Sequence, residues 1–186
     1  MTVDEILRDI LKREGWPRFT DHAADRGGPT KGGVTLKAWR RYSGRPWATA
    51  DNLKGITREQ ALLFYERVYV LDPNFDDLPT SRLRALVVDY AVNSGPRTAA
   101  RALQQVLNDL GVRPRLRVDG RVGPKTRAAL GMVSEADVYL ALLIQRTRFL
   151  VRLGLSDPKT QALLASDKTL QLHNLRGWTN RLADFA

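Results

Sequence analysis

The sequence predicts a mainly α-helical fold that contains one small β-hairpin near residues 18–35. Apolar residues recur at helical spacing in several segments, and threonines, glycines and prolines mark where these segments begin and end. Between two of the segments lies a glycine-rich stretch without helical periodicity, which is typical of turns and hairpins. With 43% hydrophobic residues in a chain of 186, there is enough apolar side chain to form a core.

The first predicted helix covers residues 3–13. Thr2 and Glu5 have the spacing of a capping box, in which each side chain satisfies a backbone N–H of the first turn. The glycine that follows Glu14 is a common residue at a helix end. Five apolar side chains fall on one face of this helix: Val3, Ile6, Leu7, Ile10 and Leu11.

Residues 16–35 are predicted to form turns and the hairpin, because glycines and prolines replace the helical pattern there. Residues 43–55 are predicted to be irregular as well. Thr57 and Gln60 then repeat the capping spacing and predict a helix over residues 57–70. Apolar periodicity predicts more helices over residues 81–93, 98–110, 124–130 and 134–152, with further helical segments within 157–185.

The composition excludes several kinds of site and segment. The chain has no cysteine and only two histidines, so thiolate metal sites, disulfides and cysteine nucleophiles are ruled out. We expect neither a metal nor an organic cofactor. No apolar run approaches the roughly eighteen residues of a membrane-spanning helix. The first residues are acidic and lack an apolar stretch, so we expect synthesis in the cytoplasm without a signal peptide.

The charge is strongly basic and unevenly distributed. The formal net charge is +10, and residues 95–186 contain 15 basic and 7 acidic side chains, whereas residues 1–94 contain 15 and 13. Such a charge favours a polyanionic partner, and it makes the C-terminal half the expected docking surface. Nucleic acid is disfavoured as that partner, because the basic residues are scattered over several predicted helices and form no single recognition helix or arm.

Glu14 is the candidate with the clearest chemical rationale. It lies three, four and seven residues after members of the apolar stripe of the first helix, so we expect its side chain to face the apolar side. Loss of hydration favours the protonated form of a carboxyl group, which is the form that a general acid needs. The alternative is a helix-end carboxylate that borders the core without a catalytic role.

Residues 13–35 resemble the N-terminal motif of the glycoside hydrolase family 108 lysozymes, which are phage and bacterial N-acetylmuramidases. In that family a Glu-Gly-Gly sequence precedes a spacer and then Asp-x-Gly-Gly-x-Thr-x-x-Gly-Ile-Thr. Glu14 and Gly15 match the first part, Trp16 stands at its second glycine, and the spacer is about two residues longer. The second part is matched by Asp25, Gly27, Gly28, Thr30, Gly33, Val34 and Thr35, with Val34 in place of isoleucine.

The resemblance continues in the same order along the chain. Residues 89–96 are similar to the Asp-x-Ala-Val-Asn-x-Gly helix end of the family, and residues 118–126 resemble the predicted peptidoglycan-binding region that follows it. Residues 176–181 are similar to its Gly-Trp-x-Asn-Arg ending. The resemblance implies a lysozyme-like helical fold in which residues 1–94 form the muramidase region. Residues 95–186 would form the peptidoglycan-binding region, packed with the first region as one compact unit.

The resemblance implies hydrolysis of the β-1,4 bond from N-acetylmuramic acid to N-acetylglucosamine. Glu14 would protonate the leaving oxygen, and Asp25 would stabilise the oxocarbenium-like centre or activate water. Thr30 or Thr35 would position the water or a sugar hydroxyl. Two alternatives remain for the second carboxylate: Asp25 as a turn residue that bonds its own backbone, and Asp21 as a competitor for the role.

Other residues are candidates for binding the glycan. Trp16 is expected to be a wall that desolvates Glu14, a platform for a sugar ring, or a residue that pins the helix end to the core. Gly28 would allow the backbone to approach a sugar closely. Tyr90 and Asn93 are expected opposite the hairpin, where Asn93 would bond an N-acetyl group or cap its helix.

Two other functions compete with the muramidase. A non-catalytic peptidoglycan-binding module would use the basic C-terminal half and would not need Glu14. A lytic transglycosylase would keep the fold and the acid but would leave 1,6-anhydro ends. For each of the three functions we expect a monomer that binds peptidoglycan glycan strands. An endolysin without a signal peptide would also need a holin or another export route to reach the cell wall.

Overall fold

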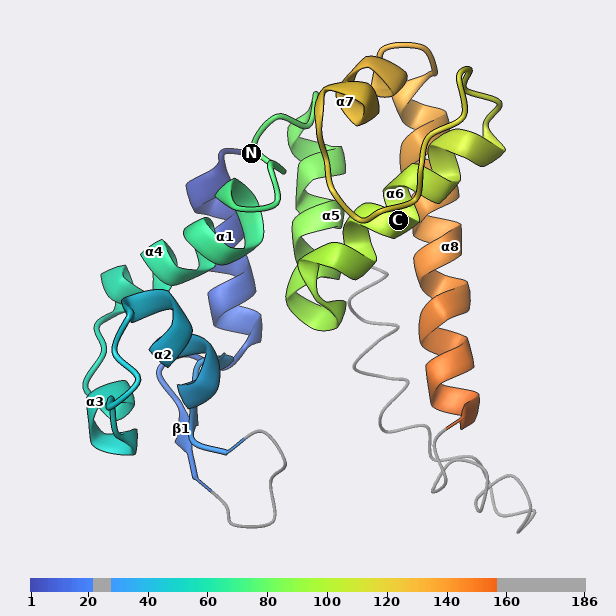
Figure 1. The fold of residues 1–186 in the computed structure, drawn as a ribbon. Coiled ribbons are helices and arrows are strands. Elements are labelled where there is room, and N and C mark those ends of the chain that lie inside the picture. Colours follow the sequence, from blue (N-terminus) through green and yellow to red (C-terminus); the bar gives the residue numbers. More distant parts are fainter. Residues whose placement is uncertain (22–27, 157–186) are drawn as a thin grey trace, which may run out of the picture. The chain divides into compact units, whose positions relative to one another are not determined.

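The structure is a computed structural model that describes residues 1–21 and 28–156, and Figure 1 shows its course. The chain divides into two compact units, Met1–Pro96 and Arg97–Ala186. Helices account for most of the described residues, and a single small sheet lies in the first unit, so the mainly α fold is confirmed. The helical segments predicted within 157–185 lie outside the described residues.

The first unit is built from helices, with a small three-stranded sheet at one end beside α2 and α3 (Figure 1). Its helices are α1 (Val3–Arg13), α2 (Leu36–Ser43), α3 (Ala50–Lys54), α4 (Arg58–Glu66), the π-helix η1 (Arg67–Leu71) and α5 (Ser81–Ser94). Its strands are β1 (Phe19–Thr20), β2 (Thr30–Lys31) and β3 (Val34–Thr35).

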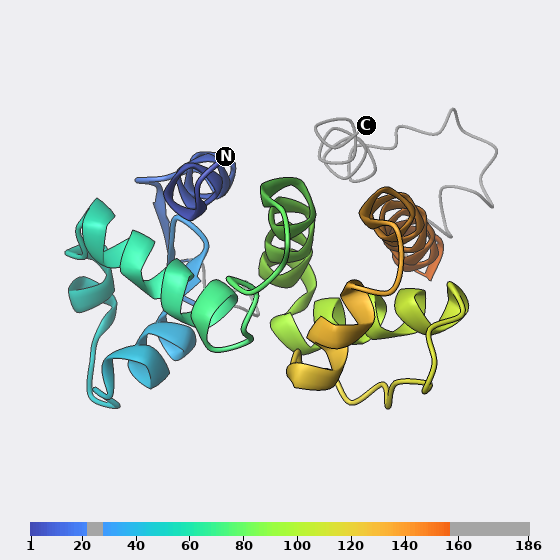
Figure 2. The same cartoon turned by 90° about the horizontal axis from the view of Figure 1, so that it is seen from above.

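Helix α1 begins and ends as predicted. The capping box of Thr2 and Glu5 is present. The apolar face packs against α4 and α5, and Figure 2 shows α1 nearly along its axis with α4 crossing beside it. Four side chains of that face are no more than 3% exposed: Ile6, Leu7, Ile10 and Leu11. Burial of an aliphatic side chain of this size contributes about 1.5 to 3 kcal/mol, so this face anchors the helix whose end positions Glu14.

The sheet contains one strand more than the predicted hairpin. Strands β2 and β3 form that hairpin, with Lys31 opposite Val34, and β1 adds to its other edge, with Phe19 opposite Lys31. Gly32 and Gly33 make the turn between β2 and β3, at φ values of +49° and +77°. A two-residue hairpin turn of this hand requires positive φ at both positions, which glycine adopts without a steric penalty.

The prediction that residues 43–55 are irregular is wrong. The short helix α3 lies within them and is capped by Thr49, whose hydroxyl accepts the backbone N–H of Asn52 while the Asn52 side chain bonds back to Thr49. Only Leu53 of this helix is buried. Capping stabilises α3 in place of an apolar stripe, so periodicity gave no signal for it.

The helix predicted over residues 57–70 changes its type partway. After α4 the chain continues as the π-helix η1, and the backbone N–H of Asp72 bonds to the carbonyl of Arg67, five residues earlier, at 2.9 Å. Short π-helical turns within helices are often found at functional sites. Here the wider turn contains Tyr69, which is described with the candidate site.

The second unit contains α6 (Pro96–Asp109), α7 (Pro124–Leu130) and α8 (Glu135–Ser156). The connection from α6 to α7 is held by two buried amide side chains of α6. Gln104, 2% exposed, donates to Asp119, Arg121 and Thr126 and accepts from the N–H of Gly120. Asn108 bonds both the N–H and the carbonyl of Leu116.

Within the described residues, no single helix is both long enough and apolar enough to cross a membrane. Helices α7 and α8 reach that length and hydropathy only together, as a pair bent by 111°.

Replacing Gln104 by alanine should destabilise the second unit. The substitution leaves the polar groups of three loop residues without their buried partner, which should lower the free energy of unfolding by about 2 kcal/mol. Urea denaturation followed by circular dichroism measures the change. Gln105→Ala is the matched control, because Gln105 is the neighbouring amide and its side chain donates to the exposed Asp109 on the same helix. Equal stability of the two variants would contradict the prediction.

Candidate active site

Glu14 lies at the end of α1, where the helix leaves the core. It is the C-cap residue, and its backbone N–H bonds to the carbonyl of Ile10 at 2.8 Å. Its side chain is half-buried, whereas Ile10 and Leu11 just before it are 1% exposed. The last turn of the helix therefore holds the carboxyl at the border between the core and the surface.

The turn between β2 and β3 approaches the Glu14 side chain closely. A Cβ atom placed on Gly33 would lie 2.9 Å from Glu14 Oε2 and 3.1 Å from Glu14 Cβ, and it would overlap the Tyr65 hydroxyl. Distances of this size are shorter than van der Waals contact, so only glycine fits at this position. The backbone of the turn thus covers one side of the carboxyl group.

Two tyrosines from α4 and η1 lie on the same side. Tyr65 is 1% exposed, and its hydroxyl donates to the carbonyl of Gly32 at 2.9 Å, which ties the turn to α4. The ring of Tyr69 lies 5.4 Å from that of Tyr65, centroid to centroid. Burial and the nearby Glu14 carboxylate raise the pKa of the Tyr69 phenol. The Tyr69 hydroxyl therefore keeps its proton at neutral pH and is available as a hydrogen-bond donor.

Trp16 packs against the other glycine of the turn. A Cβ atom on Gly32 would lie 2.7 Å from Cε3 of the indole, so the ring occupies the space that a side chain would need. Lys31 Nζ lies 4.7 Å from the centre of the Trp16 ring and donates to the carbonyls of Lys54 and Ile56 at 2.6 and 2.7 Å. Half-buried between these groups, Trp16 forms a wall of the turn two residues after Glu14.

An ion pair fixes the end of α1 to α5. Arg13, the residue before Glu14, bonds Asp89 at 3.1 Å, and Asp89 is only 3% exposed. Asn93 donates to the backbone carbonyl of Asp89 at 2.7 Å and to its side chain at 3.3 Å. The Arg13 side chain is 28% exposed, so the pair lies at the edge of the core, where it holds the last turn of α1 against α5 next to Glu14.

The predicted threonines lie on either side of the glycine turn. The Thr30 hydroxyl, on β2, donates to the carbonyl of Gly28 at 2.9 Å. Thr35, at the end of β3, caps α2 by accepting the N–H of Ala38 at 3.2 Å. Gly28 has a φ of +66° and open space where a Cβ would be.

The remaining predicted residues are found in different environments. Tyr90 is 2% exposed within α5 and offers almost no surface to a ligand, whereas Asn93 is exposed. Asp21 is exposed at the end of β1. Asp25 lies outside the described residues. Within residues 1–21 and 28–156, no three potential metal-ligating side chains come together.

The sequence alone did not identify the residues of α4, η1 and α5 that lie near Glu14 or its neighbour Arg13. Tyr65 and Tyr69 are four residues apart in one predicted helix, a spacing that places two hydroxyl groups on one face. Asp89 is a carboxylate within the apolar face of α5, which is an unusual position for an unpaired charge. Both signals are present in the sequence, but neither identifies Glu14 as the neighbour.

The second unit presents a row of arginines at its surface. Three exposed arginines occupy every second position in the connection from α6 to α7: Arg113, Arg115 and Arg117. Leu116, between the last two, is held on both its backbone groups by the buried Asn108. These arginine side chains therefore extend from a restrained backbone. They lie in the half of the chain that carries most of the excess positive charge.

Comparison with known proteins gives matches in both halves. Residues 7–95 match the family model of glycosyl hydrolase 108, and residues 98–183 match that of a predicted peptidoglycan domain. Among solved structures, Brucella abortus SagA has a TM-score of 0.73 and 26% sequence identity, with 98% of this chain and 90% of that chain covered. No curated protein matches.

The two family matches follow each other in the order that the motifs indicated. Glu14, the glycine turn and both tyrosines lie within the first match, and the arginine row lies within the second. The chain thus combines a region that matches glycosyl hydrolase family 108, residues 7–95, with one that matches a predicted peptidoglycan domain, residues 98–183, which is the layout of a glycoside hydrolase that acts on peptidoglycan.

Proposed function

We propose that the enzyme is a lysozyme that hydrolyses the β-1,4 bond from N-acetylmuramic acid to N-acetylglucosamine, with Glu14 as its general acid. The observation that carries the proposal is the position of the Glu14 carboxyl, half-buried at the end of α1 and covered by the Gly32–Gly33 turn. An acid of a glycoside hydrolase must be held firmly beside the scissile oxygen and must be partly shielded from water. The partial burial of Glu14 and the turn packed against it support this role.

In the proposed mechanism, the protonated Glu14 carboxyl donates its proton to the glycosidic oxygen as the bond to the anomeric carbon breaks. The sugar develops positive charge, and a water molecule completes the hydrolysis. Tyr69 supports the acid as a neutral neighbour whose hydroxyl does not titrate in the working range. Tyr65 acts through the turn, because its bond to Gly32 keeps the backbone against the carboxyl.

Asp25 is proposed as the second carboxylate, which stabilises the oxocarbenium-like centre or activates the water. Thr30 or Thr35 would position that water or a sugar hydroxyl, and their place on the strands beside the glycine turn supports this role. Trp16, Gly28 and Asn93 are proposed contacts to the glycan. Tyr90 is not carried forward as a contact, because its ring is buried.

The second unit is proposed to hold the enzyme on the cell wall. Peptidoglycan has carboxylates on its peptide stems, and the exposed arginines of this unit are suited to bind them. The catalytic unit has nearly balanced charges by comparison. Cleavage and retention on the polymer would thus be separate tasks of the two halves.

Glu14→Gln should abolish lysis while leaving the fold intact. An amide cannot supply the proton, and loss of a general acid typically lowers the rate by about 10²- to 10⁴-fold. Turbidity of Gram-negative cells with permeabilised outer membranes measures lysis, and Glu59→Gln is the control, because Glu59 is an exposed helix-start carboxylate.

Equal clearing by wild type and Glu14→Gln would show that another group is the acid. A folded wild type that binds purified peptidoglycan without clearing cells would leave only a binding module.

Gly33→Ala should impair catalysis far more than Gly44→Ala, a substitution at a glycine with a similar positive φ. Gly33 and Gly44 have φ values of +77° and +66°, so both substitutions force a backbone conformation that costs about 1 kcal/mol. Only at Gly33 does the new Cβ meet Glu14 and Tyr65. We expect the rate of lysis to fall about 10- to 100-fold for Gly33→Ala and to change little for Gly44→Ala. Similar rates for both variants would contradict the positioning role of the turn.

A further inference from the structure

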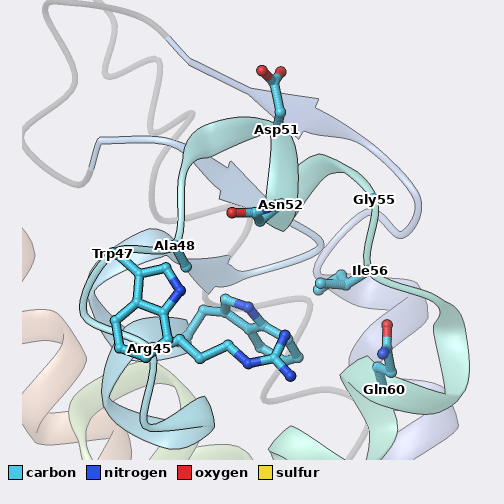
Figure 3. A pocket seen from close by; sticks show the side chains of 9 residues that line it. Arg45, Trp47, Ala48, Asp51, Asn52, Gly55, Ile56 and Gln60 are labelled. Atoms are coloured by element: carbon cyan, nitrogen blue, oxygen red, sulfur yellow. The ribbon is translucent and has the colours of Figure 1, made fainter.

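A pocket lies in the first unit around α3. Its volume is about 410 Å³, which is in the range of small-molecule sites. It shares only Ile56 with the residues described around Glu14, where the Ile56 carbonyl accepts from Lys31. Its walls come from α2, from α3, from the connections on either side of α3 and from the start of α4. Figure 3 shows the side chains that line it: Trp39, Arg45, Trp47, Ala48, Asp51, Asn52, Gly55, Ile56 and Gln60.

One wall of this pocket is aromatic and exposed. Trp47 is 72% exposed, which is unusual for a side chain of its size, and Figure 3 shows its indole at the edge of the hollow. Ile56 and Ala48, at 4% and 2% exposed, are buried behind the wall and anchor it in the core. The backbone at Ala48 is restrained, because Arg40 donates to its carbonyl at 2.8 Å. The pocket therefore offers a ligand a flat apolar face on a fixed loop.

The polar groups of the pocket are hydrogen-bond donors. The Asn52 side-chain oxygen accepts from Thr49, and the Gln60 side-chain oxygen accepts from the N–H of Thr57, both at 2.9 Å. Because the side-chain oxygens are engaged in capping, the NH₂ group of each amide remains as a hydrogen-bond donor. In the part of the chain that the structure describes, neither NH₂ group has a protein partner, and the Arg45 guanidinium has none either. Figure 3 shows that the Asp51 carboxylate points away from the hollow.

An N-acetylated sugar has the complementary chemistry. The axial C–H groups of a pyranose ring form an apolar face that stacks on an indole, and the acetamido carbonyl and hydroxyl oxygens accept hydrogen bonds. A pocket with an exposed tryptophan, two amide donors and a guanidinium is suited to both. We propose that this pocket is a second glycan-binding site, which takes an N-acetylated saccharide unit of the wall without cleaving it.

This inference rests on the proposed function, since the same polymer would supply both ligands. A second site on the catalytic unit would keep a glycan strand near Glu14 between cleavage events. Linked weak sites raise the effective concentration of the polymer without strengthening any single contact.

Two-dimensional ¹⁵N NMR of the full chain with chitotetraose tests the proposal, because that probe has N-acetylated rings and no carboxylate. The indole N–H signal of Trp47, assigned as the one lost in Trp47→Phe, should shift on titration. Trp47→Ala should weaken the binding measured at the backbone signals of Asn52 and Gln60 about tenfold. Leu63→Ala is the matched control, since Leu63 is an exposed apolar residue of α4 outside the pocket. Shifts limited to Trp16, or none at all, would overturn the proposal.

The turbidity assay separates the two possible failures. If the Trp47 signal does not respond while Glu14-dependent lysis persists, the second site is wrong and the lysozyme stands. If the Trp47 signal shifts while Glu14→Gln clears cells as well as wild type, the site stands and the assignment of the acid is wrong. If Trp47→Ala abolishes cleavage of soluble glycan, the pocket belongs to the catalytic site and is not a second site.

Discussion

The approach of the Gly33 backbone to the Glu14 carboxyl is the constraint on which the candidate site depends. The two groups are so close that no Cβ fits between them, and the Tyr65 hydroxyl occupies the rest of the space. The bond from Tyr65 to Gly32 ties this turn to α4, which itself packs against α1. On the other glycine of the turn, Trp16 fills the equivalent space. Two adjacent glycines thus allow Trp16 to pack on one residue of the turn and Glu14 with Tyr65 to pack on the other.

The same carboxyl is restrained from the helix side. The buried face of α1 fixes the helix against α4 and α5, and the ion pair from Arg13 to Asp89 fixes its last turn. Catalytic groups need supporting contacts of this kind, because small displacements of an acid cost large factors in rate. Each support comes from a regular element, whereas the strand connection that contains Asp25 lies outside the described residues. The acid is thus the better defined of the two proposed catalytic carboxylates.

Local signals in the sequence predicted the frame of the fold. The capping boxes at Thr2 and Thr57 and the apolar stripe of α1 depend only on neighbours along the chain, so they could be recognised without a structure. Helix α3 was missed because its five residues are stabilised by capping and have no apolar stripe that periodicity could reveal. The π-helical turn at Tyr69 was missed because the apolar pattern does not distinguish it from an α-helix. Glu14 was proposed from helical spacing and the family motif. Tyr65 and Tyr69 come near it, and Asp89 pairs with its neighbour Arg13, only through tertiary packing, which periodicity does not encode.

Mass spectrometry of the fragments released from purified peptidoglycan tests the central claim most directly, because the new chain ends record which bond was cleaved and how. Hydrolysis between N-acetylmuramic acid and N-acetylglucosamine predicts fragments that end in reducing N-acetylmuramic acid, which borohydride converts to the alditol. Fragments that end in 1,6-anhydro-N-acetylmuramic acid would identify a lytic transglycosylase, and reducing N-acetylglucosamine ends would identify cleavage of the other glycosidic bond. Either result would contradict the account.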